Sequence, residues 1–131
     1  MRNIRPFVVI ILLAFTAKAP AANISLQCSY PVQATPEGVS QQEFSFSLVL
    51  DTASDKAYMI GNAGSSELVV IKGLGLVSFV EVTQMGMVNT TSVITLDESQ
   101  EKGTTASVHS RAPALLGEFA PSQNYGHCEW K

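Results

Sequence analysis

The sequence has few cysteines, few basic residues and, after its first 21 positions, no long apolar run. Of its 131 residues, two are Cys, one is Trp and eight are Lys or Arg, against eleven Asp or Glu. The cations beyond residue 21 are Lys56, Lys72, Lys102, Arg111 and Lys131. Five scattered cations cannot neutralise a row of phosphates, so we expect neither nucleic acid nor an anionic membrane as a partner.

Motifs of common enzyme and metal sites are missing too. No two of His109, His127, Cys28 and Cys128 have the short spacing of a zinc motif such as CxxC or HxxxH. The glycine-containing stretches GNAG and GLG lack the strand-to-helix context of a nucleotide-binding loop, and there is no nucleophile elbow. We therefore expect no metal, no cofactor and no enzymatic activity.

The one long apolar run lies at the N-terminus. MRNIRP carries two arginines, FVVIILLAFTA is an eleven-residue apolar run, and KAPAA supplies small side chains. This order predicts a secretory signal peptide over residues 1–21, cleaved after Ala21, and hence a periplasmic or secreted protein. The run is shorter than the roughly 20 helical residues that cross a hydrocarbon core, so we expect no membrane insertion after signal removal.

Signal removal makes the chain more acidic. The whole sequence has a formal net charge of −3 at pH 7, and loss of Arg2, Arg5 and Lys18 leaves five basic and eleven acidic residues, a formal charge of −6. Such a charge can simply keep an exported protein soluble. It also makes a basic protein the best candidate partner.

The two cysteines lie near the ends of the remaining chain, residues 22–131, which has the length of a single domain. In an oxidising compartment the simplest arrangement is a Cys28–Cys128 disulfide. This bond closes a loop of about a hundred residues, which the chain-entropy account values at up to ~4.7 kcal/mol. It also requires the first and last elements to lie side by side.

Alternating apolar and polar residues predict strands throughout this domain. ISLQCSY (24–30) places Ile24, Leu26, Cys28 and Tyr30 on one face, and EFSFSLVLD (43–51) repeats the pattern. Further expected strands cover 57–60, 67–72, 76–84, 88–96, 104–111, 115–119 and 126–130, whereas VQATPEGVSQQ is expected to be a loop. The spacing predicts an all-β fold: an antiparallel meander of about eight strands that forms a small barrel or closed sandwich, with its ends joined by the disulfide.

The C-terminal stretch NYGHCEWK combines a Tyr, a His, a Cys and a Glu. Neighbours on a strand point to opposite faces, so His127 is not expected to serve Cys128 as a base. We therefore interpret Cys128 as half of a disulfide and not as a nucleophile.

Four residues are candidates for a binding surface. His109 and Arg111, in HSR, share one face of a strand and make a concentrated cationic spot, and Arg suits a carboxylate. The simpler interpretation is an exposed strand end. Tyr125 and Trp130 are candidate interface anchors, or a cover for the disulfide. Glu81 interrupts the apolar strand LVSFVEV and has three options: facing water, pairing inside, or lining a cavity.

The layout of the domain carries a resemblance. With Cys28 in ISLQCSY, a β meander, and YGHCEW near the end, residues 22–131 resemble small uncharacterised exported proteins of proteobacteria. They are more distantly similar to the periplasmic inhibitors of C-type lysozyme, which are eight-stranded barrels with terminal Cys residues. Leu26 stands where those inhibitors usually carry an aromatic, and SVHSR lies nearer the terminus than their inhibitory loop, so no inhibitory residue is transferred.

Two functions follow as expectations. The first is a non-enzymatic exported binding module, such as an inhibitor or binder of a basic envelope hydrolase or toxin. The alternative is a β-barrel that encloses a small apolar ligand.

Overall fold

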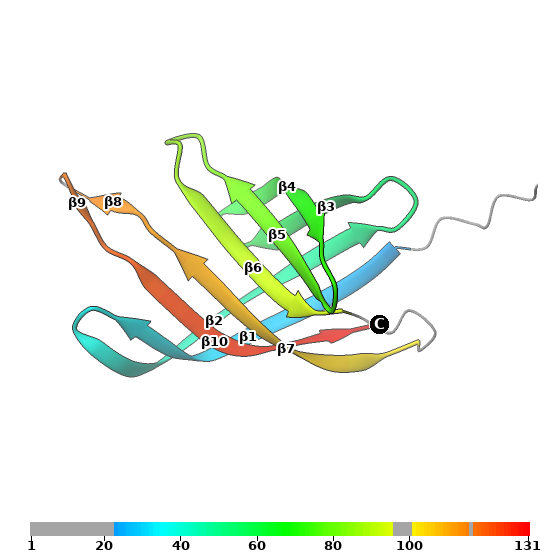
Figure 1. Ribbon diagram of the computed structural model, residues 1–131, viewed down its shortest axis with the longest axis horizontal. Helices are drawn as coiled ribbons and strands as arrows, with labels where there is room; N and C mark the ends of the chain where they lie inside the picture. The colour runs from blue at the N-terminus through cyan, green and yellow to red at the C-terminus, as the bar shows by residue number, and fades with distance from the viewer. Residues whose placement is uncertain (1–22, 96–100, 116) are drawn as a thin grey trace, which may run out of the picture.

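The computed structural model describes residues 23–95, 101–115 and 117–131, and these form an all-β structure (Figure 1). The strands are β1 (Asn23–Thr35), β2 (Gly38–Asp51), β3 (Lys56–Gly61), β4 (Gly64–Lys72), β5 (Leu76–Val82), β6 (Val88–Ile94), β7 (Gly103–Arg111), β8 (Ala114–Leu115), β9 (Glu118–Phe119) and β10 (Ser122–Trp130). The predicted signal peptide, residues 1–21, lies outside the described residues. Among those described, no helix has the length and apolar character needed to span a membrane.

Eight of the strands close into an antiparallel barrel in the order β1-β10-β7-β6-β5-β4-β3-β2, which confirms the predicted meander of about eight strands. The closure joins the first strand to the last. Cys28 pairs with Cys128 across β1 and β10, and their sulfurs form the predicted disulfide with the Cα atoms 4.0 Å apart. Beside it, the backbone N–H of Lys131 donates to the Ser25 carbonyl at 3.2 Å.

The barrel interior is filled along most of its length by the alternating residues that the sequence indicated. Leu26, Tyr30 and Leu48 are 0% exposed, and they pack with the rest of the core. The other buried apolar members are Cys28, Phe46, Leu50, Ala57, Leu68, Phe79, Val93 and Cys128. Ordinary half-buried strands, apolar inward and polar outward, therefore make up most of the wall.

The expected loop over residues 32–42 is wrong. β1 runs to Thr35 and β2 starts at Gly38, so most of this stretch is a hairpin whose ladder pairs Val32 with Gln41. Pro31 falls within β1 at an irregularity of the register, where its missing N–H breaks no ladder hydrogen bond. Proline and glycine here mark a bulge and a tight turn instead of a long loop.

The expected strand over 115–119 is also wrong in detail. It is split between β8 and β9, which pair with each other as a separate two-stranded sheet. The last barrel strand, β10, begins at Ser122, four residues earlier than expected. Its pairing with β7 along the whole length, from Ser122 to Trp130, accounts for the extension.

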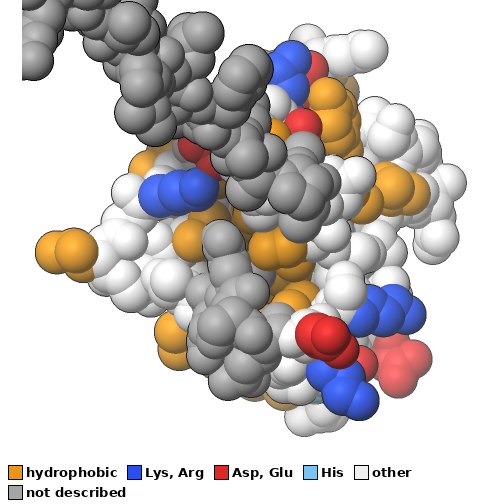
Figure 2. Space-filling view, turned by 90° about the vertical axis from the view of Figure 1, so that its right-hand side faces the viewer, with side chains coloured by type: hydrophobic (Ala, Val, Ile, Leu, Met, Phe, Trp, Pro, Cys, Tyr) orange, Lys and Arg blue, Asp and Glu red, His pale blue; other side chains and the backbone are white. Residues whose placement is uncertain are grey.

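Most of the cations lie at one end of the barrel. We call the end that carries Asn23, the β2–β3 and β4–β5 turns and Lys131 the terminal end, and the opposite end, with the β1–β2, β3–β4 and β5–β6 turns, the mouth end. The cations of the terminal end are Lys56, Lys72, Lys102 and Lys131. Figure 2 views this side and shows basic and acidic side chains around apolar ones. Lys72 Nζ, for example, lies 2.6 Å from Asp55 Oδ1.

Gly126 permits the close approach of β10 to the bulge of β1. A Cβ atom at this position would collide with the carbonyl oxygen of Ser29. We expect Gly126→Ala to lower the free energy of unfolding by about 1–3 kcal/mol, because backbone must move to admit the methyl group. Gly61→Ala is the matched control, since a Cβ at Gly61 meets nothing within 4 Å. Urea unfolding of both variants checks this, and equal effects would contradict the close approach.

Candidate binding site at the mouth of the barrel

Glu81 lies on the inward face of β5 near the mouth end. Its Oε1 accepts a hydrogen bond from Ser66 Oγ at 2.6 Å, and its Oε2 accepts one from Asn89 Nδ2 at 2.8 Å. Desolvation by burial acts to raise its pKa, but these two hydrogen bonds, together with smaller electrostatic contributions from His109 and Arg111, hold the pKa below the usual value. Glu81 is therefore ionised at neutral pH. Among the described residues, no Lys or Arg nitrogen lies within 4.0 Å of it.

Glu81 lines a cavity of about 410 Å³, which we call the mouth pocket. The other walls are Glu43, Phe44, Ser45, Phe46 and Met59, together with residues 61–66 of the β3–β4 hairpin. Of the three options that the sequence left for Glu81, the structure selects the cavity. Aromatic faces beside a carboxylate provide the two interactions that proteins use to hold an ammonium or guanidinium group.

Four carboxylates of the described residues belong to the mouth end, and two of them line the mouth pocket. Glu37 lies in the β1–β2 turn, Glu118 lies in β9, and Glu43 and Glu81 line the pocket itself. Arg111 is the single Lys or Arg among the described residues of this end, since the other cations belong to the terminal end. Four of the five described cations thus lie at the terminal end, where carboxylates such as Asp51, Asp55 and Glu129 accompany them, whereas the mouth end has four carboxylates and one cation.

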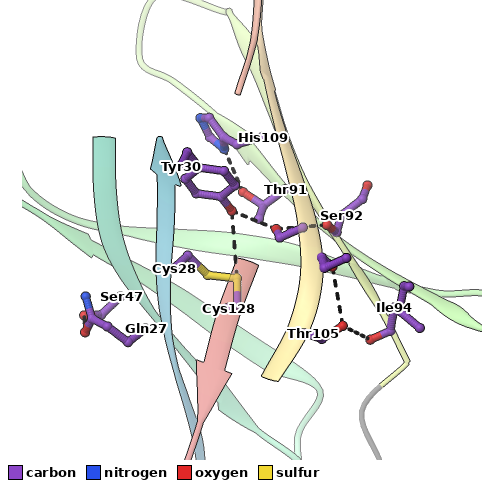
Figure 3. Close-up of a disulfide and its surroundings, with 12 residues drawn as sticks. Gln27, Cys28, Tyr30, Ser47, Thr91, Ser92, Ile94, Thr105, His109 and Cys128 are labelled. Atoms are coloured by element: carbon purple, nitrogen blue, oxygen red, sulfur yellow. Dashed lines mark hydrogen bonds between the residues drawn. A yellow bond between two sulfur atoms is a disulfide. The ribbon is translucent and has the colours of Figure 1, made fainter. Parts of the chain in front are cut away.

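His109 lies deeper inside the barrel and is 2% exposed, which contradicts the interpretation of HSR as an exposed strand end. Its Nδ1 is hydrogen-bonded to Thr91 Oγ1 at 2.8 Å (Figure 3). Its ring packs against Phe46, Phe44 and Tyr30, with centroids 5.1, 5.3 and 5.9 Å away. Burial, and then the charge of Arg111, lower the pKa of His109 to about 4, although Glu81 acts in the opposite direction. The predicted cationic spot is therefore wrong for His109, which is neutral at pH 7.

Arg111 extends from the same face of β7, as predicted. Its guanidinium carbon lies 5.5 Å from the centroid of the Phe44 ring, a cation–π contact. Arg111 also lines a second groove, of about 430 Å³, together with Pro36, Val88 and Pro121. Phe44 therefore contacts Arg111 while also forming a wall of the mouth pocket.

Tyr30 connects this region to the disulfide. Its hydroxyl lies 2.8 Å from Ser107 Oγ and 3.9 Å from Cys128 Sγ (Figure 3). Ser107 donates its own proton to the Ser92 carbonyl at 3.0 Å, so Tyr30 is the donor to Ser107. Burial raises the pKa of Tyr30 to about 12, and the phenol stays protonated. The pairing of β1 with β10 therefore fixes the position of Tyr30, whose ring packs against His109.

The other candidate residues lie elsewhere. Tyr125 is on the outer face, 42% exposed, and donates to Gln123 Oε1 at 2.6 Å. Trp130 is at the terminal end, where it packs against the core and covers Gly103. Of the four predicted binding residues, the structure brings together only His109 and Arg111. Sequence reasoning placed no weight on Phe44 as a ligand contact, and only the charge inside an apolar strand pointed to Glu81.

The proximity of a histidine, a hydroxyl and a carboxylate raises the question of catalysis. His109 is fully enclosed, its Nδ1 is engaged with Thr91, and it does not line the mouth pocket. A general base must reach the proton that it removes, and His109 does not. Cys128 is in the disulfide while His127 is exposed on the opposite face. In the part of the chain that the structure describes, no three His, Cys, Asp or Glu residues cluster as metal ligands would.

No family model, curated protein or solved structure matches this chain. The residues that line the mouth pocket therefore indicate what it can bind.

His109 makes stability depend on pH. Its folded pKa of about 4 lies below the ordinary value of 6.5, so the unfolded chain binds a proton first as the pH falls. Stability present above pH 6.5 is then lost progressively down to pH 4. Between about pH 7.5 and 5 we expect a loss of about 2 kcal/mol.

Urea unfolding at the two pH values measures this loss. His109→Gln should remove most of the pH dependence, whatever its effect on absolute stability, whereas His127→Gln, at an exposed position, should retain it. An unchanged pH dependence in His109→Gln would show that another group is responsible.

Proposed function

We propose that this protein is a non-enzymatic exported binding module that receives a cationic side chain of a basic partner protein in its mouth pocket. The observation that carries the proposal is the ionised Glu81, which lines the pocket with no Lys or Arg nitrogen within 4.0 Å among the described residues. Its two hydrogen-bond donors are both neutral. A partly buried carboxylate held in this way favours an incoming cation.

The pocket offers what a lysine or arginine side chain requires. Each oxygen of Glu81 accepts one hydrogen bond from the protein and keeps acceptor capacity for a further donor. Phe44, Phe46 and Met59 provide apolar walls for the methylene stem, and the Phe rings also attract a cation. Glu37, Glu43 and Glu118 add a long-range attraction that speeds the encounter with a basic protein.

Export is the second part of the proposal. The disulfide is consistent with an oxidising compartment, and it supports the signal peptide inferred for residues 1–21 and a periplasmic or secreted location. Basic hydrolases of the cell envelope are partners that such a protein would meet. The layout shared with inhibitors of C-type lysozyme makes a basic lysozyme a suitable first probe.

The alternative, a carrier of a small apolar ligand, draws support from the apolar walls of the same pocket. The space for such a ligand is limited because Leu26, Tyr30 and Leu48 fill the middle of the barrel. A ligand would have to remain in the mouth, next to Glu81. An ionised carboxylate there disfavours a purely apolar guest, since its desolvation is costly.

The test compares wild type with Glu81→Gln, which keeps the shape of the side chain and removes its charge. Immobilised protein is exposed to a periplasmic extract and, separately, to a purified basic C-type lysozyme, and retention and lysozyme inhibition are measured. We expect wild type to retain a basic protein and Glu81→Gln to bind it at least ~30-fold more weakly, because the partner's buried cation loses its carboxylate.

Glu129→Gln is the matched control. It makes the same change in net charge on the exposed face of β10, away from the mouth pocket, and should bind as wild type does. Retention of no basic protein, or equal weakening by both variants, would contradict the proposal. Inhibition by wild type and Glu81→Gln alike would place the interaction on another surface.

A further inference from the structure

The outer face of β4, β5 and β6 is unusually apolar. Six large side chains on these three adjacent strands are between 44% and 63% exposed: Val69, Ile71, Leu76, Val82, Val88 and Ile94. Soluble proteins rarely leave contiguous apolar side chains of this extent in water unless something covers them. On the same face, the half-buried Val80 and Thr90 are paired between β5 and β6, and the half-buried Ser78 and Ser92 form a hydrogen-bonded pair, with their oxygens 3.0 Å apart.

The same face carries little charge, with Glu67 on β4 and Arg111 beside Val88 at its edges. β6 contains no charged residue, and the one charge of β5, Glu81, points into the mouth pocket. On β4, Glu67 shares this outer face with Val69, and its carboxylate lies 4.0 Å from Lys56 Nζ. Two copies can therefore meet on this flank with few carboxylates in the contact. A basic partner would gain nothing from this flank.

The pattern of the patch is self-complementary. Val70, Phe79 and Thr91 are cross-strand neighbours and form the middle row of the three strands. The six exposed residues lie in pairs on either side of this row: Val69 with Ile71, Leu76 with Val82, and Val88 with Ile94. A two-fold axis along the row, in the plane of the face, would place each residue opposite the other member of its pair in a second copy. Apolar side chains would then meet apolar side chains on β4 and at both ends of β5 and β6, whereas near the axis Ser78 would meet Val80 and Ser92 would meet Thr90.

We propose that a second copy of this chain covers the outer face of β4–β6, in an isologous dimer whose two-fold axis follows the Val70–Phe79–Thr91 row. The strands of the two copies run antiparallel across the contact, so their mouth ends point in opposite directions. Each mouth pocket stays open, and the dimer presents two of them. The proposal therefore stands independently of what the mouth pocket binds.

The size of the face is typical of a weak, transient interface. Three strands about 4.8 Å apart and seven residues long, at about 3.4 Å each, make a face of roughly 24 by 15 Å. This is below the roughly 800 Å² per partner of a standard interface. The dimer should therefore be reversible, with a dissociation constant on the order of 1–100 μM.

Sedimentation equilibrium of the disulfide-intact protein, over a concentration range that brackets these values, tests the proposal. We expect a monomer–dimer equilibrium in wild type. Val88→Asp and Ile94→Lys should each weaken it at least ~10-fold, because each buries an unpaired charge. The double variant should recover most of the affinity, because the axis places the new carboxylate of one copy opposite the new ammonium group of the other.

Val39→Asp is the control, since Val39 is similarly apolar and exposed but lies on the β1–β2 hairpin. It should dimerise as wild type does. Wild type that stays monomeric throughout, or Val39→Asp that weakens the dimer as much as Val88→Asp, would overturn the proposal. If the double variant does not regain affinity, the proposed two-fold arrangement is wrong. A two-fold axis parallel to the strands, between β5 and β6, would instead place Val88 of one copy opposite Val82 of the other.

Discussion

The bond between Cys28 and Cys128 is the constraint on which the rest of the structure depends. It joins the first strand to the last across a separation of 100 residues and turns an open meander into a closed barrel. A domain of about 110 residues has a modest core, so a cross-link that restricts its unfolded chain is a large contribution. Closure also removes two sheet edges that would otherwise be free to pair with other chains.

The mouth site is a consequence of that closure. Glu81, Phe44 and Arg111 come from β5, β2 and β7, which meet at one end only because the strands surround a common interior. Tyr30, on the same face of β1 as the disulfide, packs on both the Phe44 and His109 rings and holds this end together. The same geometry gives different parts of the barrel wall different side chains. The inward face presents a carboxylate at the mouth, the turns of the terminal end carry most cations, and the outer face of β4–β6 carries little charge.

The alternation of apolar and polar residues was sufficient to predict the fold, because every second side chain of a half-buried strand faces the core. The pairing of the two cysteines then supplied the closure. The β1–β2 hairpin was missed because Pro31, Pro36 and Gly38 have the composition of a loop, and the ladder that unites them is a tertiary property. His109 and Glu81 were ambiguous for a related reason: alternation shows that two residues share a face, but burial and hydrogen-bond partners decide whether either keeps a charge.

The most direct test is a thiol titration of the purified protein, unfolded in denaturant without a reducing agent. No thiol should react before reduction, because Cys28 and Cys128 are bonded to each other. Two thiols per chain should appear after reduction. Two free thiols before reduction would contradict the covalent closure of the barrel, and with it the oxidising location and the fixed mouth that the proposed binding requires.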